Sequence, residues 1–211
     1  MSQAQATKTL RQSLELRPGV SLWFTTTQRL FNQVAVFYWQ VLDAHQAVLG
    51  LPAKEALTRL ERLTHTTADN PHPVMPLSCV AGQVPAFFRR AAIHAALGSM
   101  HSFQTRRAQW QRAKRNAEAK GKSYQVRPPV PPRTWNRSVV FYAGMWKQAT
   151  NGRITLKLYD GQTWRWVRFR VQGPSLPETW DRGSPQAVRH GQRWWLHVPL
   201  RAGWHLVRRH L

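Results

Sequence analysis

One stretch of the chain, from Arg153 to Val171, combines the residue types that bind nucleic acids. If it forms strands, its second half alternates between two faces, because successive side chains of a strand point to opposite sides. One face carries aromatic and basic side chains, which are Trp164, Trp166, Arg168 and Arg170. Indole rings stack on bases and guanidinium groups bind phosphates, so this face predicts contacts with a nucleic acid. In the alternative interpretation, the tryptophans cover a second core layer and the arginines extend past them to water.

The same stretch predicts a β-hairpin. Two alternating runs meet at Asp160-Gly161, and a two-residue Asp-Gly link between such runs is a strong hairpin signal. The other face of the second strand carries three apolar side chains, Val167, Phe169 and Val171. We therefore expect a hairpin with one face toward a core and one basic, aromatic face.

The overall charge points to the same class of partner. The 211 residues include 31 Lys and Arg against 9 Asp and Glu, which gives a formal net charge of +22. A folded chain with this imbalance repels itself unless a polyanion neutralises it, which favours nucleic acid as the partner. A membrane surface is the weaker alternative, because no apolar run is long enough to span and no basic amphipathic helix is free of core packing. The 11 tryptophans exceed what a core of this size needs.

Enzymatic chemistry finds no support in the sequence. The acids that could hold metals in a nuclease are few, and Asp160 is used in the turn while Asp181 and Glu178 lie in a long loop. Four histidines, His190, His197, His205 and His210, are expected on unrelated faces, without metal-ligand spacing. The single cysteine, Cys79, is expected to be a buried, unreactive thiol, and it fits a reducing compartment. We predict no active site, no metal and no cofactor, in a cytoplasmic protein without a secretory signal.

Helices are expected to occupy the first half of the chain, after a short strand at residues 6–16. Apolar residues recur at helical spacing from about Ser21 to Gly50, and Pro52 opens a second helix. A third helix has the stripe Ile93, Leu97, Met100 and Phe103. These helices predict an antiparallel bundle.

A basic segment follows this third helix. Residues 106–133 contain nine Lys or Arg and one acid, Glu118, and such a stretch is usually solvated and partly disordered, although RNA can order it. Its first basic residues are Arg106, Arg107, Arg112, Lys114 and Arg115. The run RPPVPPR, from Arg127 to Arg133, excludes helix and inner strand and so marks a boundary. By contrast, Trp39 and Trp110 are expected in the core.

Several short strands are predicted after this boundary, including a tight turn at His190-Gly191. The first strand is too isolated to be stable alone, so we expect it to pair with these late strands. The sequence therefore predicts an α+β fold, an antiparallel β-barrel interrupted by an inserted α-helical bundle.

With this order of elements, the sequence resembles the N-terminal part of the TnpB and type V CRISPR effector family of RNA-guided nucleases. The similarity rests on the segments KTLRQSLEL, TTTQRLFNQVAVFYWQVL with Asn32, SCVAGQVPAFFRRAAIHAALGSMHSF, NRSVVFYAGMW, ITLKLYDGQTWRWVRFRV and GQRWWLHVPL. The resemblance implies a wedge-like barrel with its first strand in residues 1–18, a recognition lobe over 19–126, a linker over 127–135 and the rest of the barrel over 136–198. Residues 199–211 would be an aberrant or truncated tail, because the chain stops where the family's RuvC-like nuclease domain begins.

The resemblance implies contacts residue by residue. Contacts to an RNA scaffold would fall on Lys8, Arg11, Lys157, Trp164, Trp166, Arg168 and Arg170. The segment that helps to read a short motif beside the target DNA matches Ser78, Gln83, Arg89 and Arg90, whose alternative role is an ordinary helix start with solvated arginines. The residues that would track a nucleic-acid backbone are Arg106, Arg107, Arg112, Lys114 and Arg115.

Three functions follow from these expectations. The first is a non-enzymatic module that holds a guide RNA scaffold and helps to recognise target DNA. The second is one half of a split endonuclease whose RuvC-like part is on another chain. The third is a generic structured-RNA-binding protein.

Overall fold

The computed structural model describes residues 7–132, 134–149, 152–174 and 180–202, and it shows an α+β fold. The helices are α1 (Val20–Ala44), α2 (Ala53–Thr64) and α3 (Ala86–Glu118), with short 3-10 turns η1 (Gln46–Gly50), η2 (Leu77–Cys79) and η3 (Ala143–Met145). The strands are β1 (Thr7–Glu15), β2 (Val139–Val140), β3 (Trp146–Ala149), β4 (Arg153–Tyr159), β5 (Trp164–Gln172), β6 (Trp180–Arg182), β7 (Gln186–His190) and β8 (Arg193–Ala202).

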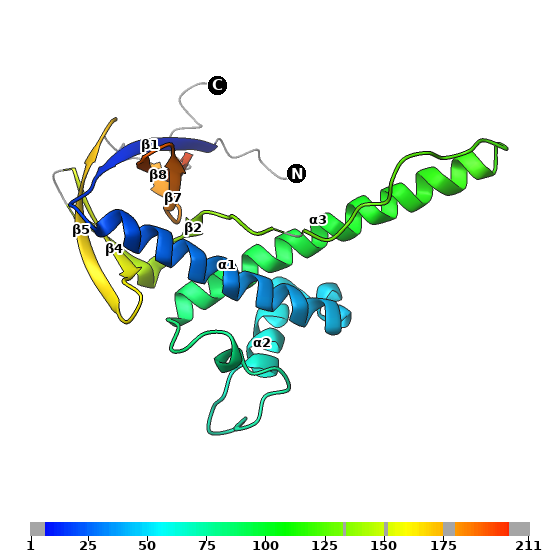
Figure 1. The fold of residues 1–211 in the computed structure, drawn as a ribbon, viewed down its shortest axis with the longest axis horizontal. Coiled ribbons are helices and arrows are strands. Elements are labelled where there is room, and N and C mark those ends of the chain that lie inside the picture. The colour runs from blue at the N-terminus through cyan, green and yellow to red at the C-terminus, as the bar shows by residue number, and fades with distance from the viewer. Residues whose placement is uncertain (1–6, 133, 150–151, 175–179, 203–211) are drawn as a thin grey trace. The chain divides into compact units, whose positions relative to one another are not determined.

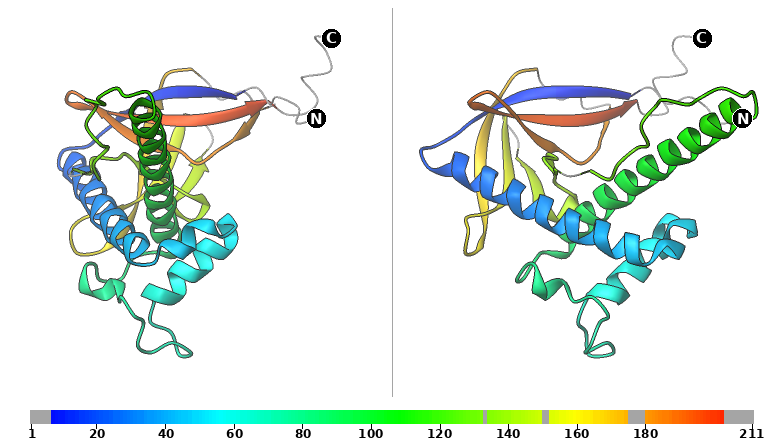
Figure 2. Two further views of the ribbon diagram at one scale, coloured as in Figure 1. Left: turned by 90° about the vertical axis from the view of Figure 1, so that its right-hand side faces the viewer. Right: turned by 45° about the vertical axis from the view of Figure 1, so that its right-hand side comes forward.

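All eight strands belong to one antiparallel sheet, which curls into a half-barrel (Figures 1 and 2). Its order is β2-β7-β8-β1-β5-β4-β3, and β6 also pairs with β8. Strand β1 lies at the centre because it pairs with β8 on one side, from Thr7 opposite Arg201, and with β5 on the other. The prediction that the first strand pairs with late strands is confirmed. Strand β8 runs to Ala202, beyond the expected end of the barrel at residue 198, while residues 203–211 of the expected tail lie outside the described residues.

The hairpins β4–β5 and β7–β8 have turns of different length. The link between β4 and β5 has four residues, because Tyr159 pairs with Trp164, so the prediction of a two-residue turn at Asp160-Gly161 is wrong. A two-residue turn joins β7 to β8, where His190 pairs with Arg193 and Gly191 has a φ of 59°. Glycine tolerates this left-handed backbone without the penalty of a Cβ atom.

The chain divides into two compact units. The first comprises the chain up to Phe31, Pro85–Ala91 and the chain from Asn136 onward, and the second comprises Asn32–Val84 and Ala92–Trp135. The boundaries between the units fall inside α1, just before α3, inside α3 and after Trp135. The reason is packing, because the first parts of these helices supply core side chains to the sheet.

The core of the first unit forms between the start of α1 and one face of the sheet. Phe24 is only 1% exposed. Its ring centroid lies 4.9 Å from that of Trp194 on β8 and 5.3 Å from that of Phe169 on β5. The buried strand residues around it include Leu10, Leu14, Ile154, Leu156, Leu158, Leu196, Val198 and Leu200. We call this the inner face of the sheet and the opposite one the outer face.

The core of the second unit is helical. Its buried side chains include Val34, Tyr38, Val41, Leu42, Leu60, Leu63, Ile93, Leu97, Met100 and Phe103. The Tyr38 hydroxyl lies 3.1 Å from that of Thr64, which satisfies two buried polar groups. Trp39 is buried and meets Phe103 edge to face, with ring centroids 5.7 Å apart, so its predicted place in the core is confirmed.

Candidate nucleic-acid interface

A continuous basic surface lies on the outer face of strands β3, β4 and β5. Residues that pair directly across strands share a face, and the register aligns Lys147 with Thr155 and Thr155 with Arg168. The neighbouring pairs on this face are Lys157 with Trp166 and Arg153 with Arg170. We call the resulting surface the basic face, and it consists of Lys147, Arg153, Lys157, Trp166, Arg168 and Arg170. The inner side of the same strands is apolar, so the alternation predicted for this hairpin is confirmed.

Trp166 is the aromatic centre of the basic face. Its side chain is 41% exposed, an unusual position for a residue of this size. The Lys147 ammonium lies 4.6 Å from the ring centroid and the Lys157 ammonium 5.7 Å from it. Both distances are within the range of cation–π attraction. The arrangement brings a stacking surface and two mobile cations to one spot.

Trp164 has a different environment. Its ring centroid lies 4.8 Å from that of Phe88, at the start of α3, and 5.3 Å from that of Tyr159. Phe88 is itself buried, so Trp164 packs against the edge of the core. Of the two indoles predicted to stack on bases, the structure leaves one exposed and covers the other in part.

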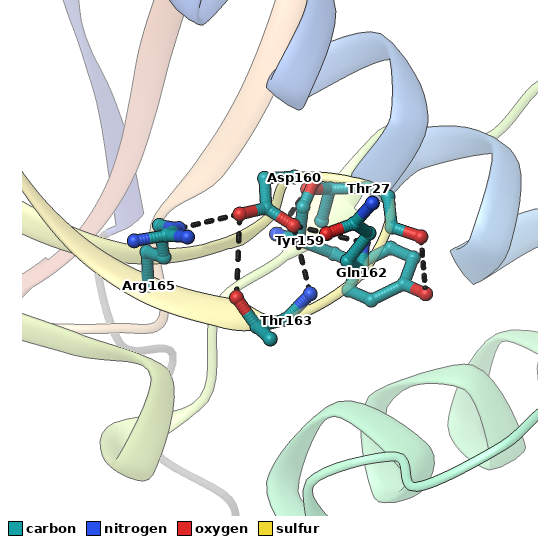
Figure 3. A network of polar contacts seen from close by, with 7 residues as sticks. Thr27, Tyr159, Asp160, Gln162, Thr163 and Arg165 are labelled. Atoms are coloured by element: carbon teal, nitrogen blue, oxygen red, sulfur yellow. Dashed lines mark hydrogen bonds and ion pairs between the residues drawn. The ribbon is translucent and has the colours of Figure 1, made fainter.

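The turn between β4 and β5 is fixed by a polar network (Figure 3). The Asp160 carboxylate accepts hydrogen bonds from the backbone N–H groups of Gln162 at 2.8 Å and Thr163 at 2.7 Å, and it pairs with Arg165. The Thr163 N–H, then Arg165 and the Gln162 N–H hold the pKa of Asp160 well below its usual range. Because this carboxylate is committed to the turn, it leaves the basic face without a neutralising acid from the hairpin.

Buried Thr27 connects α1 to the same turn. The backbone N–H of Tyr159 donates to the Thr27 hydroxyl at 2.9 Å, and that hydroxyl donates to the carbonyl of Trp23 at 2.7 Å. A buried hydroxyl that both accepts and donates fixes the orientation of its partners. The hairpin is thereby held in register against the helix, and the basic face is held with it.

The two candidates on β1 lie on opposite faces. Arg11 pairs with His197 and has the same parity as Glu15, which pairs with Arg170, so Arg11 is on the outer face. Lys8 pairs with buried Leu200 and has the parity of the core residues, although its side chain is exposed at the end of the strand. Lys8 and Arg11 therefore lie on opposite faces of the sheet.

His190 and His197 are neighbours on the outer face, with ring centroids 5.9 Å apart, so the expectation of unrelated faces is wrong for this pair. Within the described residues, Nε2 of His197 is buried and has no hydrogen-bond partner. Burial, followed by the nearby charges of Arg11 and His190, lowers the pKa of His197 below its ordinary value of 6.5.

This histidine predicts a pH dependence of stability. Because the pKa of His197 is lower in the folded state, the unfolded state binds more protons below about pH 6.5, and the free energy of unfolding falls as the pH decreases through that range. Urea titrations between about pH 5 and pH 7 should show this slope. Replacing His197 with Gln should flatten this slope. Equal slopes in the wild-type chain and His197→Gln would contradict the assignment.

The four candidates for reading a DNA motif do not form one set. Ser78 and Gln83 are exposed and belong to the second unit, whereas Arg89 and Arg90 belong to the first. Arg89 is buried, which keeps its guanidinium from a base edge, and Arg90 is half-buried. Cys79, beside Ser78, is exposed, so the expectation of a buried thiol is wrong. Ser78 lies in η2 and Gln83 in the loop that follows it, whereas Arg89 and Arg90 lie in the first turns of α3, which begins at Ala86.

The first part of the basic segment, up to Glu118, is helical. Helix α3 continues to Glu118, and its predicted backbone contacts, Arg106, Arg107, Arg112, Lys114 and Arg115, are all exposed. The chain then folds back, and the Trp110 indole donates a hydrogen bond of 2.7 Å to the carbonyl of Val126 while its ring lies 6.1 Å from that of Tyr124. This part of α3 has no apolar stripe, and the returning segment covers Trp110, which is half-buried.

Sequence reasoning missed two members of the basic face, Lys147 and Arg153. Arg153 belongs to the predicted hairpin and has the same parity as Lys157, so the alternation alone could have found it. Lys147 is recognised only through the pairing of β3 with β4, which a single sequence does not specify.

The described residues thus define an α+β protein whose curled antiparallel sheet carries a basic, aromatic outer face. A family model described as the Aq_aa04 family matches residues 8–160, and the chain belongs to that family. No curated protein matches the chain. Among the described residues, no three or more His, Cys, Asp and Glu side chains gather as a potential metal site. In the same part of the chain, no helix combines the length and apolar character that crossing a bilayer requires.

Proposed function

We propose that this chain is a structured-RNA-binding protein without enzymatic activity of its own, and that the basic face is its principal RNA contact. The observation that carries the proposal is the exposed Trp166 between two lysines and beside three arginines. An exposed cation–π contact contributes about 0.5–1 kcal/mol. Stacking on a base contributes about 1–3 kcal/mol, and the lysines gain phosphate contacts in exchange. RNA therefore competes favourably for both the ring and the cations.

The particular role follows from the resemblance to TnpB and type V CRISPR effectors. In that role the half-barrel is part of a wedge-like barrel that holds a guide RNA scaffold, and the helices are an inserted bundle that helps to recognise target DNA in the cytoplasm. Other partners are the target DNA and, in the split-enzyme alternative, a separate RuvC-like chain. The net charge of +22 supports a polyanionic partner in every version.

A charge-matched comparison tests the basic face. In one variant Lys147, Lys157 and Arg168 become Gln, and in the control Lys54, Arg59 and Arg62 on the exposed side of α2 become Gln, so both lose three positive charges. Filter-binding titrations of a structured RNA at several salt concentrations give the slope of log K against log salt. The first variant should flatten this slope by roughly 2–3, at about 0.7–0.9 for each phosphate that the protein no longer neutralises. The control should change little, and an equal flattening in both variants would refute a localised face.

Selectivity tests the guide-RNA role separately. We expect tighter binding to a structured RNA than to duplex DNA of equal length, and one defined RNA species among the nucleic acids that co-purify with the protein. Ribosomal RNA as the bound species would favour the generic RNA-binding alternative. A neighbouring reading frame with the missing acidic triad, together with metal-dependent cleavage by the two co-purified chains, would favour the split endonuclease.

A further inference from the structure

A cavity lies where β1 separates from β5. Strand β1 pairs with β5 only through Ser13–Glu15, and the chain then turns through residues 16–19 into α1. Among the described strands, β5 pairs only with β4 from Trp164 to Phe169, so this edge of β5 has no strand partner there. The cavity at this point has a volume of about 510 Å³. All of its lining residues belong to the first unit.

The lining is strongly positive on one side and apolar on the other. Its charged residues are Arg17, Arg153, Arg168, Arg170 and Glu15. Glu15 accepts a hydrogen bond from the Gln172 side chain, and within the described residues none of the four arginine side chains has a hydrogen bond or ion pair. Leu16, Val20 and Phe169 supply apolar surface. Four arginines against one glutamate give the lining an excess of positive charge, so the cavity favours an anion.

We propose that this cavity binds a phosphate monoester, carried by the end of a nucleic-acid strand or by a free mononucleotide. A guanidinium group presents paired N–H donors that match two phosphate oxygens, which makes arginine suited to this anion. A monoester carries nearly two charges near neutral pH, whereas each backbone diester carries one, so it makes better use of four arginines. The volume lies within the 300–1,000 Å³ of small-molecule sites, and the apolar wall leaves room for a sugar or base beside the phosphate.

For strand ends, this inference rests on the proposed RNA-binding function. Substitution of Arg17 nevertheless tests the cavity separately from the basic face. Arg17 lines the cavity and is not part of the basic face, whereas Lys157 belongs to the basic face and does not line the cavity. Replacing Arg17 with Gln therefore tests the cavity, and replacing Lys157 with Gln is the matched control. Arg17 is exposed and Lys157 is half-buried on the outer face of the sheet, so neither change removes a side chain from the core.

The experiment measures the affinity of the full chain for one RNA with a 5′-phosphate, a 3′-phosphate or hydroxyl ends, and for adenosine 5′-monophosphate by competition. We expect roughly tenfold tighter binding of one phosphorylated end than of the hydroxyl form, the gain typical of one charge-assisted hydrogen-bond pair. Arg17→Gln should remove this ratio and keep the affinity for the hydroxyl form. Lys157→Gln should weaken all forms and keep the ratio.

The outcomes separate the sources and the two proposals. If the mononucleotide competes with RNA for the wild-type chain but not for Arg17→Gln, the cavity binds a free nucleotide. If RNA with a phosphorylated end binds more tightly but the mononucleotide does not compete, the cavity binds the end of a strand. Equal affinity for all RNA ends with no binding of the mononucleotide overturns the cavity proposal and leaves the basic face untouched. A phosphate gain that persists in Arg17→Gln also overturns it, because the gain then reflects charge alone.

Discussion

Replacing Trp166 with Ala is expected to weaken RNA binding by about 1–3 kcal/mol, or roughly 5- to 150-fold, because the indole is the exposed stacking surface of the basic face. The ring is 41% exposed and lies against the ammonium groups of Lys147 and Lys157, so removing it leaves no cavity in the core. The free energy of unfolding should stay within about 0.5 kcal/mol of the wild-type value. Binding is measured by fluorescence anisotropy with a labelled structured RNA, and stability by urea titration.

Trp164→Ala is the matched control for this prediction. It removes an indole from the same strand and the same face, but one that packs on Phe88 and Tyr159. We expect a loss of about 2 kcal/mol in the free energy of unfolding, below the 3–5 kcal/mol typical of a fully buried aromatic ring. If Trp164→Ala weakened RNA binding more than Trp166→Ala at equal folded fraction, the assignment of the two rings would be reversed.

Phe24→Ala is expected to destabilise the fold more than either tryptophan replacement, by about 3–5 kcal/mol. The ring is almost fully buried between Trp194 on β8 and Phe169 on β5, so truncation opens a cavity at the point where helix α1 joins the sheet. This is a large share of the roughly 5–15 kcal/mol that holds a typical domain folded. Thermal and urea unfolding, followed by tryptophan fluorescence, measure the change.

Leu22, on the same helix, provides the control for Phe24. Its side chain is 62% exposed, so Leu22→Ala should shift the free energy of unfolding by no more than about 0.5 kcal/mol. Phe24→Leu should cost less than Phe24→Ala because it retains part of the apolar volume. A cost for Leu22→Ala equal to that of Phe24→Ala would contradict the packing described for the start of α1.

Local patterns in the sequence predicted a large part of this architecture. The alternation after Asp160 indicated that Phe169 faces the core, and the stripe from Ile93 to Phe103 indicated the buried side of α3. The first strand is isolated in the sequence, and because an unpaired strand is not stable, we predicted that it pairs with late strands. It pairs with β8. For the strand face and the helix stripe, the information lies in the period of apolar residues, which depends on local geometry.

The remaining features depend on tertiary contacts. The turn at Asp160 has four residues because the carboxylate caps two backbone N–H groups, an arrangement that competes with a two-residue turn. The division of the chain inside α1 and α3 follows from contacts of Phe24 and Phe88 that no helical period reveals. For the site, residue types indicated Trp166, Lys157, Arg168 and Arg170, whereas the contribution of Lys147 and the separation of Lys8 from Arg11 required the strand register.

The central position of β1 has a consequence for the synthesis of the protein. Thr7 pairs with Arg201, so β1 leaves the ribosome long before β8 is made. At about 5–20 residues per second, the interval is on the order of 10–40 s. During this time the apolar side chains of Leu10 and Leu14 lack the strands that later flank them, and the sheet cannot form. The helical unit, whose segments end at Trp135, can fold first, and the sheet then assembles only after the last strand emerges.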